Sequence, residues 1–228
     1  MKARSFGVCL ATTALLVTAG AVVWWQIAAR PDQANEEWTA NFAERLAIPG
    51  VSNGGRVNPR LYRGGQPSEE GLARLAQLGV GTVVNLRHES SLVERERRLV
   101  EARGMRYVSI PLDGATTPSD EKVAKFLELL AREPNERVFV HCRRGAERTG
   151  VMVAAARIAF DGWESERALA EMNAFSFRGF FYPHLKRYVR GLPRALHESP
   201  AFARIVRVPA LTPSPALPAA PTGVPAHT

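Results

Sequence analysis

The residues best suited to chemistry lie in one stretch, His-Cys-Arg-Arg-Gly-Ala-Glu-Arg-Thr-Gly at positions 141–150. The apolar run 138–140 before it predicts a buried strand, and the nearly all-apolar run 151–160 after it predicts a buried helix. A strand, a tight loop and a helix N-terminus together form an anion site, because unpaired N–H groups and the helix dipole face the loop. A thiol at such a site loses its proton readily, which makes Cys142 a candidate nucleophile.

Arg148 lies six positions after Cys142. The loop can therefore curl and place the guanidinium beside the thiolate. A guanidinium binds two phosphate oxygens at once. The spacing predicts a phosphate pocket with a nucleophile at its base, and the alternative is a structural cysteine beside a run of surface arginines.

Several residues around this pair make the motif more specific. His141 precedes the cysteine, Gly145 permits a tight loop and Thr149 follows the arginine. With the pattern His-Cys-x-x-Gly-x-x-Arg-Thr-Gly, the sequence resembles the cysteine-based protein tyrosine phosphatases over residues 58–192. It is most similar to their compact dual-specificity branch, which includes bacterial members. The run Leu-Tyr-Arg-Gly-Gly-Gln-Pro at 61–67 also looks like the opening strand and turn of that branch.

The resemblance implies a role for each loop residue. Such an enzyme needs an ionised nucleophile, stabilisation of charge on the phosphate and a proton for the leaving oxygen. Cys142 is expected to form a phosphocysteine, Thr149 to donate to its sulfur, and His141 to support the loop from behind and lower the thiol pKa. The phosphate is expected to lie on the guanidinium and the backbone N–H groups of Arg143, Arg144, Gly145, Ala146, Glu147 and Arg148.

The proton donor should be a carboxyl group on a neighbouring loop that follows a strand. Asp113 directly follows the predicted strand 105–112, and Gly114 beside it lets the loop move. Asp120 is the rival, but it lies in the first turn of a predicted helix, where a carboxylate has an ordinary dipole role. We therefore predict Asp113 as the general acid.

The substrate is less well defined by the sequence. Arg143 and Arg144 at the rim favour multiply phosphorylated targets, whereas Glu147 is expected to repel additional phosphate groups. Arg63 and Arg87, at the ends of predicted strands, are weaker pocket candidates. We predict hydrolysis of phosphotyrosine, extending to phosphoserine and phosphothreonine. The alternatives are a phosphoinositide or other small phosphate ester as substrate, or a membrane-anchored phosphate-binding module without activity.

The elements that must position these residues alternate along the chain. Predicted strands at 61–63, 80–86, 105–112 and 137–140 are separated and followed by helices at 68–77, 89–103, 119–132, 149–160, 163–175 and 181–190. This order predicts an α/β fold, a mostly parallel central sheet flanked by helices, of the dual-specificity-phosphatase type. Ligands of such sheets bind beyond the carboxyl ends of the strands, where the Cys142 loop belongs.

The N-terminal segment suggests a membrane anchor. Residues 5–29 carry no charge, and as a helix they would span about 37 Å, more than the bilayer core of about 30 Å. Lys2 and Arg4 precede the run and acidic residues follow it, which predicts a cytoplasmic N-terminus. We expect a single-pass inner-membrane protein with its catalytic domain in the periplasm. The alternative is a cleaved signal peptide and release into the periplasm.

Composition limits the remaining possibilities. The 228 residues are 46% apolar with a net charge of +8, which suits anionic substrates or a membrane surface and not nucleic acid. The five histidines are scattered without ligand spacing, so neither a metal nor another cofactor is expected, and the oligomeric state is not indicated. The predicted domains are a signal anchor or transmembrane helix (1–30), a linker with a short helix (31–57), the phosphatase domain (58–192), a C-terminal extension (193–208) and a Pro/Ala-rich disordered tail (209–228).

Overall fold

The computed structural model describes residues 39–88 and 90–205, and only the backbone of residues 90–92. The chain divides into two units, Met1–Phe42 and Ala43–Thr228, and the elements described below belong to the second.

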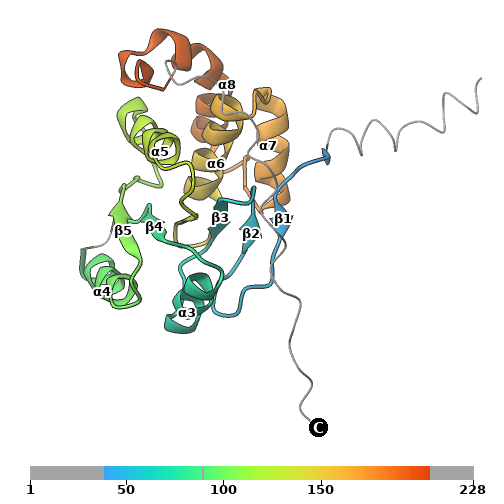
Figure 1. The fold of residues 1–228 in the computed structure, drawn as a ribbon. Helices are drawn as coiled ribbons and strands as arrows, with labels where there is room; N and C mark the ends of the chain where they lie inside the picture. Colours follow the sequence, from blue (N-terminus) through green and yellow to red (C-terminus); the bar gives the residue numbers. More distant parts are fainter. Residues whose placement is uncertain (1–38, 89, 206–228) are drawn as a thin grey trace, which may run out of the picture. The chain divides into compact units, whose positions relative to one another are not determined.

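A six-stranded sheet forms the centre of this unit, in the order β1-β2-β3-β6-β4-β5 (Figure 1). The strands are β1 (Glu44–Arg45), β2 (Gly55–Arg56), β3 (Leu61–Gly64), β4 (Thr82–Asn85), β5 (Arg106–Ser109) and β6 (Val138–His141). The four predicted strands, β3 to β6, run parallel, while β1 and β2 add an antiparallel edge that the sequence does not predict. The sheet is therefore mixed, with its parallel part where we expect it.

Helices cover both faces of the sheet. Figure 1 shows α3 and α4 on one side and α5 to α8 on the other. Their bounds are α3 (Glu69–Gln77), α4 (Ser90–Glu101), α5 (Asp120–Arg132), α6 (Glu147–Phe160), α7 (Ser165–Ala174) and α8 (Pro183–Glu198), followed by a short 3-10 turn, Pro200–Phe202. Ser68 caps α3 as predicted, since its hydroxyl accepts the Gly71 N–H at 3.2 Å. All six predicted helices are thus present.

Strand register decides which side chains meet on each face. The row Tyr62, Phe139, Val83 and Tyr107 faces α3 and α4, where it packs with Leu72, Leu75 and Val100. Because strand side chains alternate, the next row (Arg63, Val140, Val84 and Val108) points to the opposite face, on the side of α6. The last row, Gly64, His141, Asn85 and Ser109, returns to the α3–α4 face at the carboxyl ends of the strands.

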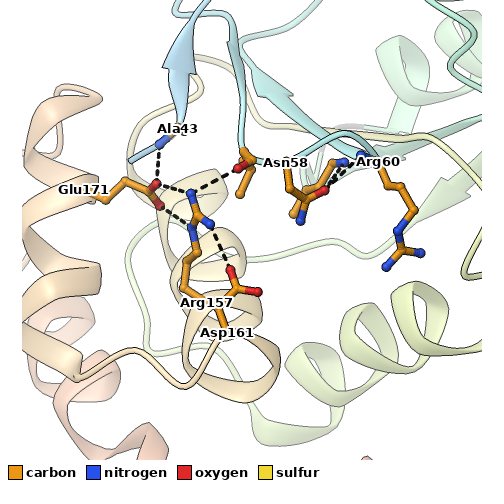
Figure 2. A network of polar contacts seen from close by, with 8 residues as sticks. Ala43, Asn58, Arg60, Arg157, Asp161 and Glu171 are labelled. Carbon is orange, nitrogen blue, oxygen red and sulfur yellow. Dashed lines mark hydrogen bonds and ion pairs between the residues drawn. The ribbon is translucent and has the colours of Figure 1, made fainter. Parts of the chain in front are cut away.

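A buried ionic network joins α6 and α7 to the chain around β1 and β2 (Figure 2). The Arg157 guanidinium donates to Glu171 Oε1 at 2.7 Å, to Asp161 Oδ2 at 2.9 Å and to the Val57 carbonyl at 3.1 Å. Glu171 also accepts the Ala43 N–H at 2.6 Å. Removing one member of such a satisfied buried pair typically costs about 3–5 kcal/mol, so the network holds the helices to this edge of the sheet.

The structure corrects the predicted membrane anchor. Within residues 39–88 and 90–205, no helix combines the length and the apolar character needed to cross a bilayer. The largely apolar α6, for example, has 14 residues, which span only about 21 Å. This finding corrects two predictions: the transmembrane helix in the fold class, and the single-pass inner-membrane location with a periplasmic catalytic domain. The segment 1–30 and the tail 209–228 lie outside the described residues.

Candidate active site

The site lies beyond the carboxyl ends of the parallel strands. The register sets Gly64, His141 and Asn85 side by side, so the segments that follow β3, β6 and β4 meet at one edge. The loop from Cys142 to Ala146 follows β6, and α6 begins directly after it at Glu147. The predicted order of strand, tight loop and helix N-terminus is therefore present.

Close backbone contact with the turn after β3 shapes this loop. Gly145 has φ +71°, and a Cβ atom there would lie 2.4 Å from the carbonyl carbon of Gly64 and 2.6 Å from the nitrogen of Gly65. The Gln66 N–H donates to the Arg143 carbonyl at 3.2 Å. Only glycine combines this φ with so close an approach, so the turn after β3 forms the floor of the loop.

Cys142 lies at the base of the loop and is 2% exposed. Its sulfur accepts the Gly145 N–H at 3.3 Å. Burial raises the pKa of the thiol, but interactions with the Thr149 hydroxyl and N–H, the charge of Arg148 and the Arg144 N–H outweigh it and lower the pKa below its usual value. Within the described residues, the buried Thr149 hydroxyl has no hydrogen-bond partner, so no other group competes with the sulfur for it. The site thus favours a thiolate.

Arg148 is held in place before any substrate arrives. Its Nη1 donates to the carbonyl of Leu86, just after β4, at 3.3 Å and to that of Leu112 at 3.2 Å. The side chain is half-buried. Two backbone acceptors on different segments restrict the guanidinium, so its remaining donors are pre-oriented for an anion.

The two candidate acids differ in their surroundings. Asp113 is exposed and its Oδ1 accepts the Ala115 N–H at 2.9 Å. The next residue, Gly114, would place a Cβ atom 3.8 Å from Arg148 Nε, which brings this loop beside the site. Asp120 instead accepts a hydrogen bond from the Tyr188 hydroxyl of α8 at 3.0 Å. A structural contact therefore occupies Asp120, whereas Asp113 is open to a ligand.

His141 belongs to a buried polar cluster behind the loop that the sequence does not reveal. Its Nε2 lies 2.9 Å from Glu96 Oε1 of α4, and both side chains are almost fully buried. Asn85 donates to Glu96 and, at 2.8 Å, to the Tyr107 hydroxyl. Burial first, and the Glu96 charge next, raise the Tyr107 pKa. The cluster ties the end of β6 to α4, and the strand register places His141 on the face that α4 covers.

The rim carries more positive charge than the sequence suggests. Arg143 and Arg144 are exposed. Glu147, which we expected to repel phosphate, is only 8% exposed; its Oε1 lies 3.1 Å from Arg178 Nε and 3.6 Å from Arg144 Nη1. The two arginines offset the negative charge of Glu147, which weakens the repulsion that it exerts on a phosphate group.

The two weaker candidates occupy different places. Arg87 lies beside the turn after β3, where its Nη1 donates to Gln66 Oε1 at 2.6 Å. Arg63 is not in the pocket: it is completely buried beneath the loop and donates to the Gly145 carbonyl at 3.0 Å.

A parallel sheet whose central strand ends in a cysteine loop, with an arginine at the start of the next helix, defines the class as cysteine-dependent phosphatases. Residues 42–182 match the family model described as DSP-PTPase phosphatase fused to NAD+ kinase. The chain belongs to this family, within the compact dual-specificity branch of the cysteine-based protein tyrosine phosphatases.

Individual relatives agree with this assignment. Dual specificity protein phosphatase TpbA of Pseudomonas aeruginosa is 33% identical over 122 residues, 54% of this chain and 54% of TpbA. Inositol diphosphatase DSP2 of Oryza sativa is 29% identical over 119 residues, 50% of this chain and 57% of DSP2. The crystal structure of a cysteine-to-serine variant of P. aeruginosa TpbA in complex with phosphotyrosine has a TM-score of 0.58 at 28% identity, covering 70% of this chain and 98% of that one. The chain thus spans about half the length of the curated relatives it matches.

Proposed function

We propose that the chain hydrolyses phosphomonoesters through a phosphocysteine on Cys142, with phosphotyrosine as the principal substrate and phosphoserine and phosphothreonine as further ones. We assign the activity to residues 58–192. The observation that carries the proposal is a thiol whose pKa the loop lowers, at the N-terminus of a helix and beside the pre-oriented Arg148. The similarity to TpbA, whose variant binds phosphotyrosine, supports the substrate class.

The proposed reaction has two displacements at phosphorus. The Cys142 thiolate attacks, a sulfur–phosphorus bond forms, and the bond to the leaving oxygen breaks as Asp113 donates its proton to that oxygen. Water then attacks the phosphocysteine while the Asp113 carboxylate accepts a proton, which releases inorganic phosphate and restores the thiolate. Arg148 and the loop N–H groups stabilise the charge on the non-bridging oxygens in both steps.

An inositol phosphate or diphosphate is the second candidate substrate. The single negative charge of Glu147 is shared by two arginines, Arg144 and Arg178. Together with Arg143, these residues therefore leave the rim with a net positive charge. A basic rim accommodates additional phosphate groups. The relative named inositol diphosphatase DSP2 supports this option.

The test is phosphate release by the full-length protein from four substrates: an aryl phosphate, a phosphotyrosyl peptide, a phosphoseryl peptide and an inositol diphosphate. We expect turnover of the first three, with a lower kcat/KM for the phosphoseryl peptide than for the phosphotyrosyl peptide, and none by Cys142→Ser. Absence of release from every substrate would overturn the activity. Release by Cys142→Ser would overturn the mechanism, and a higher kcat/KM for the inositol diphosphate than for the phosphotyrosyl peptide would favour the second substrate.

A further inference from the structure

Arg63 is the most unusual charged residue of the described structure. It lies in the middle of β3 with no exposed surface. A buried guanidinium loses its hydration and normally recovers stability from carboxylates, as Arg157 does with Glu171 and Asp161. Within residues 39–88 and 90–205, Arg63 makes no ion pair of this kind, and its Nε and Nη1 have no hydrogen-bond partner. Its burial therefore needs another explanation.

The contacts of Arg63 point to the catalytic loop. Its Nη2 donates to the Gly145 carbonyl at 3.0 Å, and its guanidinium carbon lies 4.0 Å from the centre of the Phe175 ring. Asn53 Nδ2 donates to the same carbonyl, also at 3.0 Å. Two donors on separate segments therefore fix the orientation of one peptide of the loop.

That peptide joins Gly145 to Ala146, the last residue before α6. In a planar trans peptide the C=O and N–H bonds point in opposite directions. Because Arg63 and Asn53 hold the Gly145 carbonyl, the Ala146 N–H points to the opposite side of the peptide, away from Arg63. The position of this phosphate-binding donor depends on Arg63 and Asn53.

Arg63 also lies close to the nucleophile, because Gly145, whose carbonyl it binds, donates its N–H to the Cys142 sulfur at 3.3 Å. Burial lowers the pKa of Arg63 to about 10, while the negative charges of Glu171 and of the Cys142 thiolate act to raise it. Arg45 and Arg157 are the further charged groups that act on it, and both lower its pKa. The attraction between two opposite charges stabilises both of them, so a charged Arg63 also stabilises the Cys142 thiolate.

We propose that Arg63 is a positioning residue of the active site, which fixes the Gly145–Ala146 peptide from beneath the loop and acts as a buried counter-charge to the Cys142 thiolate. The role of Arg63 in fixing the Gly145–Ala146 peptide rests on the proposed phosphatase function. Its role as a counter-charge to the thiolate can be measured without turnover.

The first experiment compares Arg63→Gln with Arg157→Gln in the full-length protein. Both remove a buried guanidinium, but the acceptors of Arg157 described above, Glu171, Asp161 and the Val57 carbonyl, lie outside the loop. Alkylation of Cys142 by iodoacetamide is followed from pH 5 to pH 9 by peptide mass spectrometry, which separates it from Cys9. We expect Arg63→Gln to slow alkylation about 3- to 10-fold on the acid side of the thiol pKa, and Arg157→Gln to leave the rate within twofold of wild type.

An unchanged alkylation profile in folded Arg63→Gln, or an equal change in both variants, would overturn the counter-charge. If wild type releases no phosphate while Arg63→Gln still slows alkylation, the proposed function fails and the counter-charge stands. Folding is checked by urea denaturation and near-UV circular dichroism.

Asn53→Gly provides the second test and covers the case in which Arg63→Gln does not fold. Asn53 has φ +51°, which glycine tolerates, and the change removes a donor to the Gly145 carbonyl without removing a charge. We expect kcat/KM for an aryl phosphate and affinity for orthovanadate each to fall about 3- to 10-fold, with the alkylation profile unchanged. Unchanged kcat/KM and vanadate affinity would overturn the role of the fixed peptide.

Discussion

Gly145→Ala should disable the catalytic loop, because two separate penalties meet at this position. The residue has φ +71°, which costs a non-glycine residue about 1–2 kcal/mol. The new Cβ atom would lie 2.4 Å from the Gly64 carbonyl carbon and 2.6 Å from both the Gly64 oxygen and the Gly65 nitrogen. Ordinary contact begins at 3.4 Å, so the loop or the end of β3 must move by about 1 Å. Overpacking of this kind adds about 1–3 kcal/mol, giving a total loss of unfolding free energy of about 2–5 kcal/mol.

The same displacement predicts the effect on catalysis. A shift of about 1 Å in a catalytic group lowers activity by roughly 100-fold, so kcat/KM of Gly145→Ala for an aryl phosphate should fall by about that factor. Gly104→Ala is the matched control, since Gly104 has φ +73° and a Cβ atom added there would meet nothing within 4 Å. It should lose about 1–2 kcal/mol and keep kcat/KM within twofold of wild type. Equal kcat/KM in the two variants would refute the argument that backbone contact shapes the loop.

Three further predictions concern the acid and the thiol. Asp113→Asn should lower kcat about 100-fold for substrates with poor leaving groups and much less for those with good ones. Asp120→Asn should lose about 1 kcal/mol of unfolding free energy, and its kcat should not depend on the leaving group in this way. A series of aryl phosphates and urea denaturation check both variants, and the reverse pattern would make Asp120 the acid. Thr149→Val should raise the thiol pKa and move the acid limb of kcat/KM to higher pH; an unmoved limb would argue against the hydroxyl. The folded Cys142 pKa is lowered, so the thiolate stabilises the fold above the unfolded pKa of about 8.5, and this stability is lost as pH falls through the folded pKa. Wild type should therefore gain unfolding free energy relative to Cys142→Ser between pH 5 and pH 9, and a constant difference would contradict the lowered pKa.

Local patterns predict the parallel sheet, its helices and the position of the loop. Short apolar runs mark β4 (Val83 and Val84) and β6 (138–140), and the motif that follows β6 is itself contiguous. The predictions of the phosphatase class and family rest on that contiguity, and the family match confirms them. The antiparallel edge is missed because β1 and β2 have two residues each, too few for any periodicity.

Other features depend on residues that are far apart in the chain. Glu96 meets His141 only because α4 covers the face to which the last residue of β6 points. Glu147 pairs with Arg178, 31 positions away. The prediction that Glu147 repels additional phosphate groups did not take this partner into account. The membrane prediction is corrected by the absence of a helix able to span a bilayer within residues 39–88 and 90–205. It relied on the length and flanking charges of the segment 1–30, which lies outside these residues.

The contact between Gly145 and the turn after β3 has a consequence for evolution and for engineering. Gly64 and Gly65 lie about eighty positions before Gly145, yet their backbones occupy the space that any side chain at Gly145 would need. Because every residue type carries these backbone atoms, no substitution at position 64 or 65 relieves the clash, so glycine should be retained at position 145 among relatives. A designer who transplants the His-Cys-x5-Arg loop into another parallel sheet must also carry over the neighbouring glycine turn.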